Sequence, residues 1–147
     1  MENKHSLIIG GTRGIGRAFV HMLSKDGHAV SVIGRHTPYE KDMKLSNVHF
    51  FTVNLIAFKN VKRKLQTIIT QKGKLTNLVF FQQYRGQGDD WKGEIETSLT
   101  ATKNIIELLK DNFVDQGEKS IVLVGSNASQ YIAVEQPISY HVAKGAF

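Results

Sequence analysis

Residues 6–19, SLIIGGTRGIGRAF, join an apolar run to a glycine-rich turn and the start of a helical pattern. Gly10, Gly14 and Gly16 have the spacing G-x-x-x-G-x-G, which differs from the commoner dinucleotide fingerprint G-x-G-x-x-G. Glycines in such a turn let the backbone approach a ligand, and the helix that follows offers unpaired N–H groups to a phosphate. The stretch therefore predicts a pyrophosphate site after a buried strand. The alternative is a tight connection that binds no ligand.

Composition places the chain among single folded domains. Its 147 residues are 41% hydrophobic and 22% charged, with two prolines and no cysteine. The lack of cysteine excludes disulfides and thiolate metal sites, which favours a reducing, cytoplasmic setting. The N-terminus lacks the apolar run of a signal peptide, and no stretch approaches the roughly 20 apolar residues of a membrane span. We expect no membrane partner.

The formal net charge of +6 raises the question of a nucleic-acid partner. The densest basic cluster is Lys59, Lys62, Arg63 and Lys64, in a segment with helical apolar spacing. Such a cluster is usually the solvated face of a helix, and no aromatic residues alternate with it, so we expect no nucleic-acid partner. The six histidines show no ligand spacing, so we expect them at the surface or in local hydrogen bonds, with no metal site.

Apolar runs of strand length alternate with helical patterns along the chain. Strands are expected at 6–9, 29–33, 48–53, 77–81 and 120–124, and helices at 15–25, 56–72 and 92–113. Several of the strand runs are continuously apolar, which is typical of strands buried on both faces. The alternation predicts an α/β fold in which helices cover both faces of a parallel sheet, with a ligand site at the carboxyl ends of the strands.

A tyrosine and a lysine near the end of the sequence, Tyr140 and Lys144, are four residues apart. On a helix this spacing puts the phenol and the ammonium on one face. A phenol is a useful acid or base near neutral pH only when a nearby positive charge stabilises the phenolate. Alone, the two residues would be interpreted as a surface pair. With the glycine turn and Ser126, which follows the fifth expected strand, they form a specific constellation.

In their order along the whole chain, these features resemble the short-chain dehydrogenase/reductase family. The resemblance implies a doubly wound, Rossmann-like sheet with strand order 3-2-1-4-5. It also implies an oxidoreductase that transfers hydride between a nicotinamide cofactor and a small-molecule carbonyl or alcohol. In such enzymes the tyrosine is the acid or base, the lysine holds the nicotinamide ribose, and the serine binds the substrate oxygen. These catalytic roles fall on Tyr140, Lys144 and Ser126, and we expect a homodimer or homotetramer.

The expected cofactor is NADP(H). An NAD site usually ends the second strand with an acidic residue for the ribose hydroxyls, but here that end reads Ile33-Gly34-Arg35-His36. Arg13 and Arg35 would instead meet at the adenosine ribose, where guanidinium groups suit a 2'-phosphate. Arg35 as an exposed loop residue without a ligand is the alternative. The expected cofactor-binding residues are Gly10, Thr12, Arg13, Gly14, Ile15, Gly16, Arg35, Asn54, Leu55, Tyr140 and Lys144.

Several residues depart from the family pattern. The usual N-N-A-G after the fourth strand is replaced by residues 80–83, FFQQ. Ser98 stands where the family has an asparagine in the long helix, and Asn54 stands for the usual aspartate after the third strand. Ser129 competes with Ser126 for the serine role.

The sequence ends at Phe147, within the expected helix of Tyr140 and Lys144, whereas enzymes of this family continue well beyond that point. We therefore expect residues 1–147 to form a single NAD(P)-binding domain that is incomplete at its C-terminus. With the departures above, this keeps a second hypothesis open: a non-catalytic NADP(H)-binding module with a regulatory role.

Overall fold

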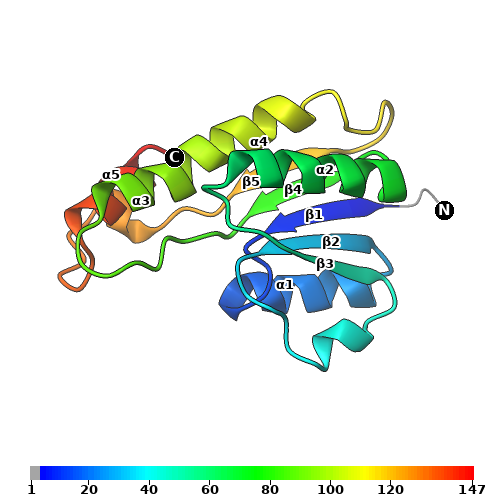
Figure 1. Cartoon of the computed structure of the whole chain (residues 1–147), viewed down its shortest axis with the longest axis horizontal. Helices are drawn as coiled ribbons and strands as arrows, with labels where there is room; N and C mark the ends of the chain where they lie inside the picture. Colours follow the sequence, from blue (N-terminus) through cyan, green and yellow to red (C-terminus); the bar gives the residue numbers. More distant parts are fainter. Residues whose placement is uncertain (1–3) are drawn as a thin grey trace.

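The computed structural model of the chain describes residues 4–147; the first residues of the expected domain lie outside that range. Five parallel strands form a single sheet (Figure 1). The strands are β1 (His5–Ile9), β2 (Ala29–Gly34), β3 (Val48–Thr52), β4 (Asn77–Phe80) and β5 (Ser120–Leu123). Their order, β3-β2-β1-β4-β5, confirms the doubly wound α/β fold.

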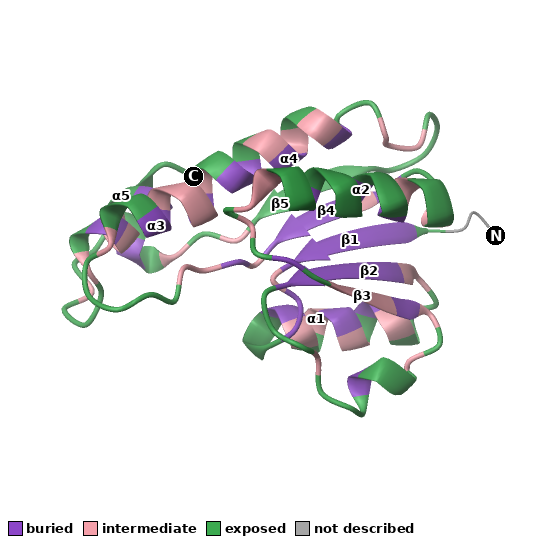
Figure 2. Cartoon of the chain, viewed as in Figure 1, coloured by how far each residue is buried: buried purple, intermediate pink, exposed green. Residues whose placement is uncertain are grey.

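Helices cover both faces of this sheet (Figure 1). The long ones are α1 (Gly14–Lys25) on one face, with α2 (Phe58–Lys72) and α4 (Ala101–Leu109) on the other; shorter ones are η1 (Asp42–Lys44), η3 (Asn127–Ser129) and α5 (Ile138–Gly145). Ile8 packs in the cluster under α1, whereas Leu7 and Ile9 pack in the cluster under α2 and α4. All three are fully buried, so β1 is buried on both faces as its continuous apolar run predicts (Figure 2).

The single helix expected at 92–113 is wrong in two respects. The segment is divided into α3 (Trp91–Ile95), the π-helix η2 (Glu96–Thr100) and α4. The helix also ends at Leu109, because the chain then turns to pair with Leu75, whose amide donates to the backbone oxygen of Asn112 at 2.8 Å. Phe113 therefore belongs to an isolated parallel bridge with Leu75 and not to the helix.

The last strand also departs from the expectation of burial on both faces. All four residues of β5 are exposed, including Ile121, Val122 and Leu123 (Figure 2). Within residues 4–147, β5 is an edge strand that pairs only with β4. Its apolar character therefore does not reflect packing within the described residues.

Candidate functional site

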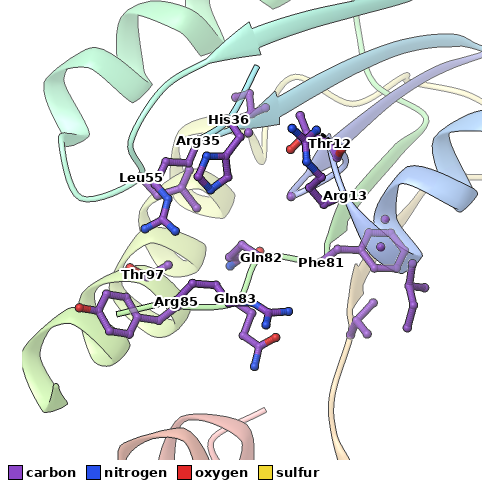
Figure 3. Close-up of a pocket in the computed structure, with 18 of the residues that line it drawn as sticks. Thr12, Arg13, Arg35, His36, Leu55, Phe81, Gln82, Gln83, Arg85 and Thr97 are labelled. Carbon is purple, nitrogen blue, oxygen red and sulfur yellow. Dashed lines mark hydrogen bonds between the residues drawn. The ribbon is translucent and has the colours of Figure 1, made fainter. Parts of the chain in front are cut away.

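A cleft of about 800 Å³ opens at the carboxyl ends of the strands, as predicted for a doubly wound sheet. Gly10, Gly34, Asn54, Phe81 and Val124, which follow or end the five strands, all line it. Figure 3 shows side chains from these strand ends around the same space. The cleft also contains every residue expected to bind the cofactor: Gly10, Thr12, Arg13, Gly14, Ile15, Gly16, Arg35, Asn54, Leu55, Tyr140 and Lys144.

The glycine turn between β1 and α1 is packed against backbone. Gly10 has φ +85°, and a Cβ there would lie 2.6 Å from the backbone nitrogen of Gln82. A Cβ on Gly16 would collide with the backbone oxygen of Gly10. Gly14 has φ +54° with open space in front of it, and Arg13, the N-cap residue, makes no side-chain cap. The first N–H groups of α1 are thus available to an anion, so the turn fits a pyrophosphate.

Positively charged side chains line the cleft. Arg13, Arg35, Arg85 and Lys144 line it, and the described lining residues include no aspartate or glutamate. The two guanidinium groups expected to meet, Arg13 and Arg35, lie on the same cleft, from the glycine turn and the end of β2 (Figure 3). A wall rich in arginine, with no acidic residue among its described members, favours binding of a phosphate group. These members offer no carboxylate that could bind ribose hydroxyls.

The side chain of Arg13 is held in place by its neighbours. Its Nη1 donates to the backbone oxygen of Thr12 at 2.8 Å, and its Nη2 donates to that of Thr37 at 2.9 Å. Sequence reasoning did not assign Tyr39, whose ring lies beneath the guanidinium of Arg13. The only signal was an aromatic residue shortly after the end of β2.

A second cluster that sequence reasoning missed is a set of charged side chains that link η1 to α1 near Tyr39. Arg17 donates two hydrogen bonds of 2.7 Å to the carboxylate of Asp42, and His21 lies 2.8 Å from the same group. The Arg17 guanidinium, assisted by His21, lowers the pKa of the buried Asp42 to about 2. Asp42 is therefore a charged anchor for the loop that carries Tyr39.

The phenol and ammonium expected to do the chemistry come together on α5. Tyr140 and Lys144 both line the cleft, and Lys144 Nζ lies 5.8 Å from the centroid of the Tyr140 ring. Lys144 is buried and donates to the backbone oxygen of Val124 at 3.3 Å. Burial lowers the pKa of Lys144, and the carboxylate of Glu94 opposes part of that shift.

The serine candidates lie beside the cleft without lining it. Ser126 is half-buried, and its Oγ accepts a hydrogen bond from the backbone N–H of Ala128 at 3.2 Å. Ser129 is exposed and donates to the backbone oxygen of Ser126 at 2.7 Å. Val124 and Gly125 line the cleft just before them. Ser126 is thus nearer to the cleft along the chain, and its role stays a prediction.

A buried polar chain lies behind the wall that replaces N-N-A-G. Gln82 Nε2 donates to Thr102 Oγ1 at 2.7 Å, Thr102 donates to the backbone oxygen of Ser98 at 2.6 Å, and Ser98 donates to Glu94 at 2.5 Å. All four residues are buried. Glu94 precedes Ser98 by four residues, a helical spacing that sequence reasoning did not use. The side-chain oxygen of Gln82, Oε1, is buried and has no hydrogen-bond partner within the described residues.

The side-chain oxygen of Asn54, an expected cofactor-binding residue, makes a hydrogen bond within its own loop. This oxygen, Oδ1, accepts from the backbone N–H of Ile56 at 3.2 Å. A carbonyl oxygen has two acceptor positions, so one is left for a ligand donor.

The positions of the basic cluster and of most histidines agree with the surface positions expected for them. Lys59, Lys62, Arg63 and Lys64 are all exposed, as expected for a solvated helix face. His5 is the exception among the histidines, because it is buried in β1, where its Nε2 lies 2.9 Å from Ser31 Oγ. Residues 4–147 contain no cluster of metal-ligating side chains, and no helix within them has the length and hydropathy to cross a membrane.

Comparison with known proteins agrees with this geometry. A sequence model described as short chain dehydrogenase matches residues 4–147. No curated protein sequence matches the chain significantly.

Solved structures with the same fold include dehydrogenases and reductases. ElxO with NADP bound has a TM-score of 0.79 at 20% identity, over 98% of this chain and 63% of its own. The ligand-free aldohexose dehydrogenase of Thermoplasma acidophilum has a TM-score of 0.84 at 20% identity, over 98% of this chain and 57% of its own. A 3-oxoacyl-[acyl-carrier protein] reductase from Brucella melitensis has a TM-score of 0.80 at 19% identity, over 99% and 65%.

This chain thus spans less than two thirds of the length of these structures. Identities this low bear on the fold alone, whereas the sequence model covers nearly every residue. The chain therefore belongs to the short-chain dehydrogenase family.

Proposed function

We propose that this chain is the cofactor-binding domain of an NADP-dependent oxidoreductase that interconverts a carbonyl and an alcohol. The observation that carries the proposal is that Tyr140 and Lys144 line the same cleft as the glycine turn, and that the described lining of this cleft has no acidic residue. The turn would hold the pyrophosphate. Arg13 and Arg35 would bind the 2'-phosphate.

Asn54 and Leu55 would form the adenine side of this site, and Lys144 would hold the nicotinamide ribose. All three residues line the cleft. The bound nicotinamide supplies or accepts the hydride.

Residues of this chain carry out the proton transfer. Tyr140 donates its phenolic proton to the substrate oxygen during reduction and takes it back during oxidation. Lys144, on the same face of α5, stabilises the phenolate electrostatically. Ser126 would hold the substrate oxygen near Tyr140. The substrate is a small carbonyl compound or alcohol, and the assembly is a homodimer or homotetramer, which light scattering after size exclusion would determine.

Fluorescence titration with NADPH and NADH tests the cofactor assignment. Tight NADPH binding and weaker NADH binding are expected. If the protein binds neither cofactor, the proposal is overturned. A panel of aldehydes and ketones with NADPH, followed by absorbance at the nicotinamide band, then tests for turnover.

The second candidate function is a non-catalytic NADP(H)-binding module. It is favoured by Ser98, which stands where the family has asparagine and whose backbone oxygen already accepts the Thr102 hydroxyl. Binding of NADPH without turnover would support this function. Gain of turnover in Ser98→Asn would show that serine at this position causes the lack of turnover.

A further inference from the structure

Gln82 belongs to the wall of the cleft directly after β4. Gln82 is only 9% exposed, and it lines the cleft together with the glycine turn. The close approach of Gly10 to its backbone nitrogen fixes the position of that wall. The family's usual N-N-A-G turn has an alanine at this position, which offers no polar side chain.

The orientation of the Gln82 amide follows from its neighbours. Thr102 has one hydroxyl proton, and that proton goes to the backbone oxygen of Ser98 at 2.6 Å. Thr102 Oγ1 therefore faces Gln82 as an acceptor, so the amide group 2.7 Å away must be the nitrogen. The amide oxygen is thereby directed away from Thr102.

Within the described residues, this oxygen has no hydrogen-bond donor although it is buried. Lys144, a buried cation of the same cleft, donates to the backbone oxygen of Val124 instead. A buried acceptor without a donor destabilises a fold, so such atoms are rare unless a ligand or water completes them. Gln82 Oε1 thus points to a ligand that brings a hydrogen-bond donor.

The phosphates of a dinucleotide are anionic and accept hydrogen bonds, so they cannot satisfy a carbonyl oxygen. Ribose hydroxyls, the adenine amino group and the nicotinamide carboxamide can. Resting on the proposed function, we propose that Gln82 is a cofactor-binding residue whose side-chain oxygen accepts a hydrogen bond from a neutral donor of the bound dinucleotide. Glutamine thereby supplies a side-chain hydrogen bond at a position where an alanine side chain can supply none.

Gln82→Met tests this inference because methionine keeps the length of the side chain and removes both polar atoms. NADPH affinity should fall about tenfold, equivalent to about 1.4 kcal/mol. The melting temperature of the protein without cofactor should change little, because the removal of an unsatisfied acceptor offsets the loss of the hydrogen bond from Nε2 to Thr102. Gln66→Met, on the exposed face of α2, is the matched control and should change neither quantity.

Two half-cofactors identify the donor. If the donor lies on the adenosine half, Gln82→Met weakens adenosine 2',5'-bisphosphate and leaves reduced nicotinamide mononucleotide unaffected; the reverse result places it on the nicotinamide half. Unchanged NADPH affinity in Gln82→Met would overturn the inference. So would a parallel loss of affinity and melting temperature, which is the signature of packing alone. Absence of NADPH binding by the unmutated protein would instead overturn the proposed function itself.

Discussion

The guanidinium of Arg13 lies over the ring of Tyr39, with 4.1 Å between its Cζ atom and the ring centroid. Arg17 lies over the same ring at 5.1 Å. The backbone oxygens of Thr12 and Thr37 accept hydrogen bonds from the same guanidinium. One aromatic ring therefore supports two cations beside a cleft that has no carboxylate in its described wall.

Tyr39→Leu should weaken NADPH binding more than NADH binding, because Arg13 loses the ring that positions it. A cation–π contact at a partly exposed site contributes about 0.5–1 kcal/mol, so we expect a two- to fivefold loss of NADPH affinity. Fluorescence titration measures both affinities. Tyr131→Leu, which removes an exposed tyrosine, is the control. Equal losses for the two cofactors would argue against a role in reading the 2'-phosphate.

Arg35→Asp should narrow or reverse a preference for NADPH, because it removes a cation from the cleft and adds an anion that repels the 2'-phosphate. A charge-assisted hydrogen bond contributes about 1.5–3 kcal/mol, so NADPH affinity should fall roughly tenfold or more. Arg63→Asp makes the same charge change on the exposed face of α2 and should leave the preference intact. If the unmutated protein binds NADPH and NADH equally well, the assignment of Arg13 and Arg35 is wrong.

Gly14→Val and Gly16→Val should both abolish NADPH binding, but for different reasons. A side chain on Gly14 extends into open space in front of the helix N-terminus, where the pyrophosphate would lie, and the positive φ adds strain. A side chain on Gly16 collides with the backbone oxygen of Gly10, so this variant should also melt at a lower temperature. Circular dichroism and NADPH titration separate the two effects. Normal affinity in both variants would mean that the glycines serve only the turn.

Asp42→Asn should destabilise the protein in a pH-dependent way. The folded pKa of Asp42, about 2, lies below the ordinary value of 3.8 because of Arg17 and then His21. A depressed carboxyl pKa stabilises the fold above the unfolded pKa, and this contribution is lost as the pH falls towards 2. The deficit of Asp42→Asn should be about 2 kcal/mol at pH 7 and should shrink below pH 4.

Urea unfolding at several pH values measures this deficit. Asp115→Asn, which removes an exposed partner of Lys74, is the control and should have little effect. A deficit of Asp42→Asn that is the same at pH 7 and pH 3 would show that packing, and not the ion pair, is responsible.

Tyr140→Phe removes only a hydroxyl, so NADPH should still bind while turnover falls about 10²- to 10⁴-fold, as expected for a lost acid or base. Lys144→Ala should lower both the affinity for NADPH and the turnover rate. Ser126→Ala should reduce turnover more than Ser129→Ala. Steady-state rates on a verified carbonyl substrate, with the full-length protein where it extends beyond this chain, measure these effects. Full activity in Tyr140→Phe would disprove the proposed mechanism.

Much of the fold could be predicted from the sequence, because buried parallel strands have a strong signal. The run at β1 is apolar at every position from Leu7 to Ile9, and both of its faces are covered. The position of the cleft follows from the fold, since the glycine turn and Tyr140 come at strand and helix ends that converge.

The remaining parts depend on contacts between distant residues. The pairing of Leu75 with Phe113 ends α4 early, and no local pattern marks it. Gln82 could be recognised as unusual, but its orientation depends on a hydroxyl twenty residues later. Asp42 is in a polar loop that looks solvated in the sequence, and only the fold brings Arg17 and His21 to it.

The π-helix η2 also bears on how this helix could change by insertion or deletion. A π turn contains an extra residue relative to an α turn, and such turns occur mostly as single bulges. Deleting one residue within 96–100 would restore regular α-helical bonding and keep α3 and α4 in nearly the same relative orientation, because the π turn accommodates the extra residue within one turn. A homologue with an uninterrupted helix here should therefore align with a one-residue gap at η2, with the residues on either side of the gap facing the same neighbours.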